Sequence, residues 1–356
     1  NTKVEIPANG KHSYVCDVCT TCNKLNPVKY TRDGNYIYFG YWPQTLERDE
    51  TVVAKLNEIA GKPPLPRDKE NPFNWESHEG TTYMWQKIVI YNGTKYLGVQ
   101  MNDYRASGVY SLTSYIMKNG YFTFEVYWFK YEPIKWRILT TSGNSAFIMS
   151  DIALDSFSIQ PNRKSENRDG LFAEYNNSTG VPDGTYANNW EYCFLRGWLN
   201  ETFYNEVFND LQKEIIKTTR LDNSARSSNP NDYPNYYGYG ENAGKNKYAD
   251  QCKDTDDKIF LLSLRDITTT AYGFNKDVRA KDPARNLLAT DFAKFRGAPM
   301  DIYEEKYVTW YTRSPTSGDG NQGYATFVLD RHAKGDIGST SLVPDGGVVP
   351  ALWITL

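Results

Sequence analysis

The feature that most constrains the fold is the pair Asn92-Gly93, which stands between two β-rich runs at residues 81–91 and 94–101. Asn-Gly readily adopts the left-handed conformation of a two-residue turn, so these runs predict a β-hairpin. A further β-rich segment follows at 121–139, and "SAFIMSDIALD" predicts one more strand and a turn. The first half of the chain is therefore expected to be dominated by strands.

Other segments predict a mixture of strands and short helices. "YIYFGYWPQT" (36–45) predicts a strand that ends at a proline turn, and "DKIFLLSLRDI" (257–267) a buried strand. "TVVAKLNEIAG" (51–61) predicts a helix with Val53, Leu56 and Ile59 on one face and Gly61 as C-terminal cap. Two short helices broken near 200–204 are expected after residue 189, and a helix with Asp282 as N-cap over 282–298.

Composition favours a loop-rich extracellular protein without a polyanionic partner. The formal net charge of -3 gives no electrostatic reason to bind nucleic acid or an anionic membrane. Aromatic residues make up 15% of the chain, and Tyr and Trp suit half-buried loops and ligand surfaces. No apolar stretch is long enough to span a bilayer, and the start at Asn1 without a signal sequence predicts a processed or truncated N-terminus.

Three of the five cysteines form a cluster near the N-terminus. Cys16, Cys19 and Cys22, with His12 four residues upstream, have the spacing of soft ligands around a zinc ion. A disulfide within the cluster and a vestigial site are the alternatives. Turn residues follow, so residues 1–33 are expected to form a separate small segment. Cys193 and Cys252 lie far apart in sequence, and a disulfide between them requires an oxidising compartment.

Several stretches together resemble a known family. In order they are "YIYFGYWPQT", "YEPIKWRIL", "FLRGWLNETFYNEVF", "DKIFLLS", "ATDFAKFRGA", "WYTRSP" and "GGVVPALWITL". They resemble an uncharacterised domain family, a domain of unknown function, of secreted and cell-surface proteins from gut and oral bacteria. The last motifs also resemble, more distantly, the C-type-lectin-like fold of formylglycine-generating enzymes and of retroelement variable proteins.

The resemblance implies an α+β domain over residues 34–356, with a small twisted antiparallel sheet, flanking helices and long irregular loops. A β-rich insertion is expected around 75–130. Val349 stands where arginine is frequent in the related "GVRPAL" segment, so a role for that arginine does not carry over. The fold alone implies no function.

No catalytic motif is evident. An oxidase of the formylglycine-generating type needs a reactive cysteine pair in its C-terminal half, and no cysteine follows Cys252. A hydrolase needs paired carboxylates or a nucleophile with a base. The three histidines occur in no nucleophile motif, and the candidate acids lie at predicted strand ends, where turn and cap roles are ordinary: Glu132, Asp151, Asp155 and Asp330. We therefore do not expect an enzyme, although an unrecognised chemistry stays open.

Two segments carry oxygen donors at short spacing. "DTDDK" (254–258) and "SGDGNQ" (317–322) have the hard ligands that calcium prefers, but neither follows the EF-hand pattern. Solvated turns and a helix cap are the simpler interpretation. Calcium is thus a secondary expectation, after zinc at the cysteine cluster.

The segment "WYTRSP" poses the main functional question. In a lectin-like fold it is a central strand, with Trp310 and Thr312 facing one side and Tyr311 and Arg313 the other. Arg313 can bind a carboxylate or backbone carbonyls and so hold loops in place, which we favour over direct ligand contact.

Ligand contacts are expected in the C-terminal loops between 314 and 347 and in the Tyr-rich segment 222–250. The candidate ligand-binding residues are Trp310, Arg313, Tyr324, Asp330, Arg331, His332, Tyr236, Tyr237 and Tyr239. Aromatic and small polar side chains suit either a glycan or a protein ligand. The sequence thus predicts a non-catalytic recognition module, secreted or on a bacterial cell surface. The alternatives are a self-assembling surface protein, a homo-oligomer, and an enzyme of unrecognised chemistry.

Overall fold

The computed structural model describes residues 14–20, 23–61, 77–78, 81–101, 116–122, 125–157, 189–224, 227, 252–277, 280–300, 306–315, 324–329, 336–341 and 346–356. Within them the protein is a mixed α+β structure of open, mostly antiparallel sheets with few helices. The α+β expectation is therefore confirmed.

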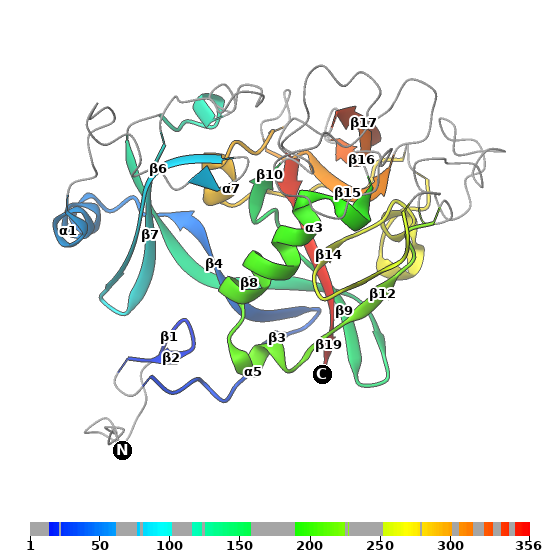
Figure 1. Ribbon diagram of the computed structural model, residues 1–356, viewed down its shortest axis with the longest axis horizontal. Helices are drawn as coiled ribbons and strands as arrows, with labels where there is room; N and C mark the ends of the chain where they lie inside the picture. Colours follow the sequence, from blue (N-terminus) through cyan, green and yellow to red (C-terminus); the bar gives the residue numbers. More distant parts are fainter. Residues whose placement is uncertain are drawn as a thin grey trace.

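The larger sheet contains ten strands and organises the molecule (Figure 1). Its main path runs β11 (Ile216–Lys217), β19 (Pro350–Thr355), β9 (Ser145–Ser150), β8 (Val126–Ser142), β7 (Thr94–Met101), β6 (Thr81–Tyr91) and β5 (Ser77–His78). Off this path, β14 (Phe260–Leu261) pairs with β19, β4 (Tyr36–Leu46) pairs with β8, and β3 (Thr31–Asp33) pairs with β4. The C-terminal strand β19 thus lies inside the sheet.

The predicted hairpin at Asn92-Gly93 is confirmed. Asn92 has a φ of 48° and Gly93 a φ of 76°, so both turn residues are left-handed, as a type I′ turn requires. The register runs from the pair Tyr91 and Thr94 back to Tyr83 and Met101. This hairpin places β6 near the end of the larger sheet (Figure 1).

The smaller sheet has five strands in the order β10 (Asp155–Phe157), β18 (Gly346–Val348), β15 (Trp310–Pro315), β16 (Tyr324–Leu329) and β17 (Asp336–Ser341). The "WYTRSP" segment is therefore the central strand, as predicted. Its pairing with β18 is parallel, and the other pairings are antiparallel. Two two-stranded antiparallel sheets complete the strands: β1 (Tyr14–Val15) with β2 (Val18–Cys19), and β12 (Thr219–Leu221) with β13 (Thr255–Asp257).

The helices are short, apart from α1 (Glu50–Ala60). The segment after residue 189 contains η1 (Trp190–Tyr192), α3 (Phe194–Trp198), the π-helix η2 (Leu199–Phe203), α4 (Tyr204–Val207) and α5 (Asp210–Lys213). Its apolar side covers β4, where the Trp42 ring lies 5.2 Å from that of Phe203. The predicted break near 200–204 is wrong, because the chain continues there as a π-helix. Asn209 starts the next helix with a capping box.

Helix α1 begins and ends as expected, but its buried face differs from the prediction. Asp49 caps the first turn, and the N–H of Gly61 donates to Asn57 O at 3.1 Å. Leu56 is fully buried, whereas Ile59 is 50% exposed. Val52, Val53 and Ala60 pack in the same cluster as Leu56, and this cluster includes Val89 of β6.

Two further local predictions are corrected. Strand β4 does not end at Pro43 but continues to Leu46, with a register shift between Pro43 and Thr45 that accommodates the missing N–H. Asp282 caps no helix. Its carboxylate binds the N–H of Ala284 in a turn, and the only helix in this stretch is α7 (Asp291–Phe295), which is capped by Thr290. The remaining short helices are η4 (Asp266–Thr268) and η5 (Thr270–Tyr272).

The described part of the N-terminal segment contacts the larger sheet and its helices. Asp17 accepts hydrogen bonds from Gln212 at 2.9 Å and from Asn26 at 3.0 Å, and β3 pairs with β4. The proposed boundary between 1–33 and 34–356, and the insertion around 75–130, stay predictions. In the part of the chain that the structure describes, no helix is long and apolar enough to cross a membrane.

Candidate functional site

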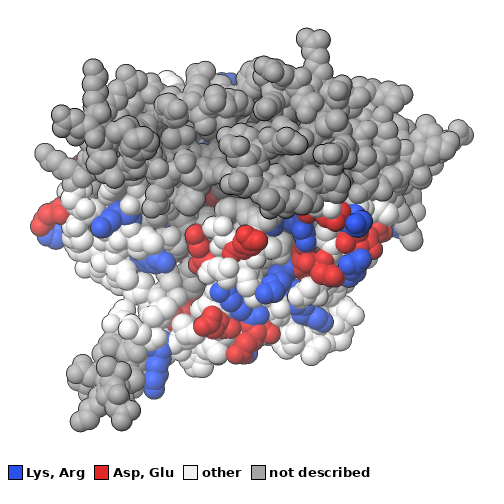
Figure 2. All heavy atoms as spheres, in the orientation of Figure 1, with Lys and Arg blue, Asp and Glu red and all other residues white. Residues whose placement is uncertain are grey.

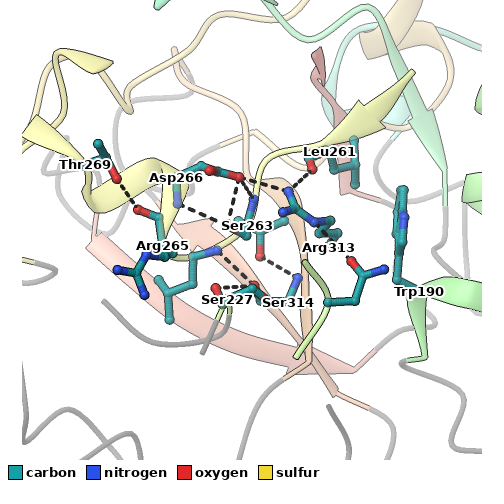
Figure 3. A network of polar contacts seen from close by, with 12 residues as sticks. Trp190, Ser227, Leu261, Ser263, Arg265, Asp266, Thr269, Arg313 and Ser314 are labelled. Carbon is teal, nitrogen blue, oxygen red and sulfur yellow. Dashed lines mark hydrogen bonds and ion pairs between the residues drawn. The ribbon is translucent and has the colours of Figure 1, made fainter. Parts of the chain in front are cut away.

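Arg313 stands at the centre of a polar network on β15 (Figure 3). Its Nη1 donates to Leu261 O at 2.8 Å and to Asp266 Oδ2 at 2.9 Å, and its Nε donates to Asn223 Oδ1 at 3.3 Å. The residue is only 8% exposed. A guanidinium that is buried this far needs such acceptors, because an unpaired charge in the interior is strongly unfavourable.

Asp266 is positioned for Arg313 by its own turn. The same Oδ2 atom accepts the backbone N–H and the hydroxyl of Ser263, both at 2.8 Å. Asp266 N in turn donates to Ser263 Oγ at 3.1 Å. This reciprocal arrangement fixes the carboxylate before the ion pair forms, so the pair has a well-defined geometry.

Asn223 extends the network towards the helical segment. Its Nδ2 donates to Lys253 O and to Thr255 Oγ1, each at 3.0 Å. Thr255 Oγ1 then donates to Asp257 Oδ2, which also accepts the indole N–H of Trp190 at 2.9 Å. A continuous chain of buried hydrogen bonds therefore joins β15 to β13 and η1.

Ser314 forms a second link beside Arg313. Its hydroxyl accepts the N–H of Leu264 at 2.9 Å and donates to Ser227 O at 3.4 Å. Ser227 O also accepts the N–H of Arg265 at 3.1 Å. We call Asn223, Ser227, Asp266, Arg313 and Ser314 the Arg313 hub.

The hub lies at the roots of two segments that are expected to contact ligands. Asn223 and Ser227 lie at the start of the Tyr-rich segment, and Lys253, which Asn223 binds, follows it closely. Pro315, next to Ser314, ends β15 before the loops that lead to β16. The sequence-distant ends of these segments are thus fastened to one buried arginine.

The first two predicted ligand contacts are buried. Trp310 has no exposed surface, and its indole N–H donates to Arg285 O at 3.0 Å. With Arg313 also engaged by protein acceptors, both environments favour the scaffold interpretation over ligand contact. Tyr324 starts β16, but its side chain and the residues Asp330, Arg331, His332, Tyr236, Tyr237 and Tyr239 lie outside what the structure describes.

The candidate acids bind three different groups. Glu132 accepts the hydroxyl of Thr45 at 2.6 Å, Asp151 pairs with Lys135 at 2.8 Å, and Asp155 pairs with Arg296 at 3.0 Å. Burial raises the pKa of Asp155, although the guanidinium of Arg296 acts in the opposite direction. Asp330 is outside the described residues. Each of the three described carboxylates thus has its own partner within the fold.

Two buried cysteines, Cys193 and Cys252, have thiols with raised pKa values. Burial raises the pKa of Cys193 to about 12 and that of Cys252 to about 11, and neither is in a disulfide. A thiol with so high a pKa is a poor nucleophile. These two cysteines therefore resemble buried structural cysteines.

The predicted zinc ligands are only partly described. Cys16 lies in the left-handed turn between β1 and β2, Cys19 is buried on β2, and His12 and Cys22 lie outside the described residues. Among the residues that are described, no group of three or more His, Cys, Asp or Glu could hold a metal ion. The zinc site stays a prediction.

The carboxylates of the "DTDDK" segment already have cationic or N–H partners. Asp254 and Asp256 both pair with Arg220, at 3.7 and 3.0 Å, and Asp257 pairs with Arg196 at 2.7 Å. A calcium ion at this segment would have to displace these arginines. On the face shown in Figure 2, acidic and basic side chains of the described residues lie intermixed.

Sequence reasoning found Arg313 but missed its partners. Asn223, Ser227 and Asp266 occur up to 90 positions before Arg313, in segments with no common motif. The only usable signal was general: an arginine in a buried strand requires acceptors nearby. That rule predicts a hub but cannot name its members.

The described residues form an α+β structure of open, mostly antiparallel sheets with a buried polar hub around β15. Residues 143–356 match the model of a domain of unknown function, DUF6273, and this match covers more than half of the chain. The chain belongs to the DUF6273 family. No curated protein and no solved structure matched the chain.

Proposed function

We propose that this protein is a non-catalytic recognition module of C-type-lectin-like fold, secreted or displayed on a bacterial surface. It binds a glycan or a protein through the loops between 314 and 347, with the Tyr-rich segment as a second contact region. The observation that carries the proposal is the Arg313 hub, which anchors the roots of both regions to the sheet. Binding residues are commonly placed on loops that a rigid scaffold positions.

Two further observations support recognition rather than catalysis. The described candidate acids are held by separate partners, and the buried thiols have raised pKa values. The aromatic and small polar residues of the loops suit adaptable contacts with sugar rings or with a protein surface. The lectin-like fold is proposed from the order of sequence motifs, and the bacterial surface location from the same resemblance.

The test is a glycan array with the purified chain, combined with capture from bacterial and host cell surfaces. Each captured protein or glycan is then purified and its Kd measured by calorimetry. The proposal expects the triple variant Asp330→Asn, Arg331→Ala and His332→Ala to weaken binding at least about tenfold, the loss expected from removing contacts in a binding centre. Arg220→Ala, an exposed arginine on β12, is the control and should bind as the wild type does.

The outcomes separate the possibilities. Glycan binding lost in the triple variant supports a lectin-like activity, and loss of a purified protein partner supports a protein receptor. An array and a capture that both yield no specific ligand contradict the proposal. Binding that the triple variant leaves unchanged contradicts the placement of the site in the C-terminal loops.

A further inference from the structure

Within the part of the chain that the structure describes, most of the outer edge of strand β6 has no strand paired to it. Among the described residues, β5 pairs only with Thr81 and Thr82 of this eleven-residue strand, and β7 pairs with its other edge. The part of β6 from Trp85 to Tyr91 contains no proline and no register shift. Proteins usually protect such an edge, since it is a template for another strand.

The hairpin register identifies the residues whose backbone groups point outwards. Tyr91 and Thr94 flank the two-residue turn and therefore form a hydrogen-bonded pair. Hydrogen-bonded pairs alternate along an antiparallel ladder, so Val89 and Lys87 also direct their N–H and C=O groups to β7. The N–H and C=O groups of Ile88 and Ile90 consequently point to the outer edge.

The same two residues carry exposed apolar side chains. Ile88 is 53% exposed and lies opposite Leu97, which is buried in the core, and Ile90 is 58% exposed and lies opposite Lys95. Val89 faces the opposite side, where it packs with Leu56 of α1. The edge thus combines outward backbone groups that pair with no described strand and a small apolar surface on one face.

We propose that β6 is a self-association edge, at which two copies of the chain pair antiparallel across a two-fold axis at Val89. In this register Ile88 lies opposite Ile90 of the second copy, and Ile90 opposite Ile88. Both are outward-pointing residues, so each pair forms two backbone hydrogen bonds. On the other face, Lys87 lies opposite Tyr91, an arrangement that permits a cation–π contact.

The sequence around Val89 is what selects a second copy as the occupant. In "KIVIY" (87–91), Ile88 and Ile90 flank Val89 on either side, so an isologous pairing of two copies covers all four isoleucines, two from each copy. A two-fold axis at Ile88 would place Ile90 opposite Gln86, and an axis at Ile90 would place Ile88 opposite Asn92. Of these three axes, only the one at Val89 places every exposed isoleucine opposite an isoleucine while the outward backbone groups pair. This interface is independent of the proposed ligand loops.

The first experiment measures the mass of the full chain by sedimentation velocity from about 1 to about 200 μM, a range suited to a small interface. We expect a concentration-dependent dimer. Ile88→Pro removes only an outward N–H and keeps the bonds to β7, so it should raise the dimer Kd about tenfold or more. Ile88→Val keeps the N–H and the β-branched shape, and should stay within about threefold of the wild type.

The second experiment tests the register by cysteine crosslinking and does not rely on Ile88→Pro folding. Val89→Cys places two thiols at a directly opposed pair without hydrogen bonds, where Cα atoms about 4.5 Å apart allow a disulfide. Ile88→Cys places its thiols on a diagonal of about 7–8 Å, beyond disulfide reach. Under mild oxidation, Val89→Cys should give a covalent dimer well above the levels of Ile88→Cys and of the wild type.

Three results would overturn the inference. The first is a monomer over the whole concentration range. The second is a dimer whose Kd is unchanged in a folded Ile88→Pro variant. The third is a dimer in which Val89→Cys crosslinks no more than Ile88→Cys does.

Discussion

Replacing Arg313 with alanine tests the hub directly. The substitution removes the donors to Leu261 O and Asn223 Oδ1, while Asp266 keeps its two bonds from Ser263. Two buried acceptors left without donors cost about 1–3 kcal/mol each, and the lost ion pair adds to this. We therefore expect Arg313→Ala to lower the free energy of unfolding by about 4 kcal/mol. Arg313→Lys keeps the charge but not the planar fork, and should cost about half as much.

The assay is urea unfolding followed by tryptophan fluorescence and by far-ultraviolet circular dichroism. Arg220→Ala is the matched control, because Arg220 also pairs with carboxylates but its side chain is 61% exposed. Exposed ion pairs contribute less than about 1 kcal/mol. If Arg313→Ala and Arg220→Ala destabilise the protein equally, Arg313 is not a structural anchor and the argument for the hub fails.

Three further predictions concern other parts of the molecule. Gly98→Ala should lower the unfolding free energy by about 1–3 kcal/mol, because a Cβ there would meet the Trp128 ring at 2.5 Å. The control is Gly197→Ala in α3, where no atom lies within 4 Å of the new Cβ, and it should not destabilise the protein. Burial alone would raise the pKa of Glu47, but the N–H of Asp49 and the ammonium of Lys130 lower it on balance. The ionised Glu47 carboxylate thus contributes folding stability that is complete above the ordinary pKa of 4.5 and is lost as the pH falls through the lower pKa of the folded state. Urea unfolding between about pH 5 and pH 3 should therefore show a smaller loss of stability for Glu47→Gln than for the wild type. Elemental analysis decides between the three alternatives for the cysteine cluster: one zinc per chain that is absent from the double variant Cys16→Ser and Cys19→Ser supports the zinc site, and a metal-free wild type prepared without chelators supports a disulfide or a vestigial site.

Local sequence signals predicted the strands better than the helices. The Asn92-Gly93 turn fixes a hairpin register by itself, because its backbone conformation determines which residues face each other. The stop at Pro43 failed because a strand tolerates proline where a bulge or an edge removes the need for its N–H. Proline therefore predicts an interruption of the hydrogen-bond ladder and not the end of the strand.

Helix predictions failed where tertiary contacts decide the conformation. Residues 282–298 contain many helix-compatible residues, yet Ala289 forms a β-bridge with Ala153, and only Asp291–Phe295 is helical. In α1, Val52 and Ile59 lie seven positions apart and therefore on the same side of the helix, so the periodicity treats them alike. Only Val52 packs against the cluster that includes Val89 of β6, and where along the helix the sheet lies is not information local to the helix.

The candidate site shows the same limit in a sharper form. The chemistry of Arg313 predicts that it binds carbonyl and carboxylate oxygens, and it does so at Leu261 and Asp266. Which oxygens these are depends on the path that brings β14 and its following turn beside β15. Polar partners at long sequence separation are a property of topology and leave no spacing to detect.

The hub also explains why a buried arginine can matter for recognition without touching a ligand. Asn223 links Arg313 to Lys253 and Thr255, so the two ends of the Tyr-rich segment share one anchor. Loss of that anchor would leave the loop sequences intact but increase the conformational freedom of their ends, and ordering a freer loop costs binding free energy. In the proposed recognition function, Arg313 would therefore affect affinity through the segment ends that it holds and not through direct contact with the ligand.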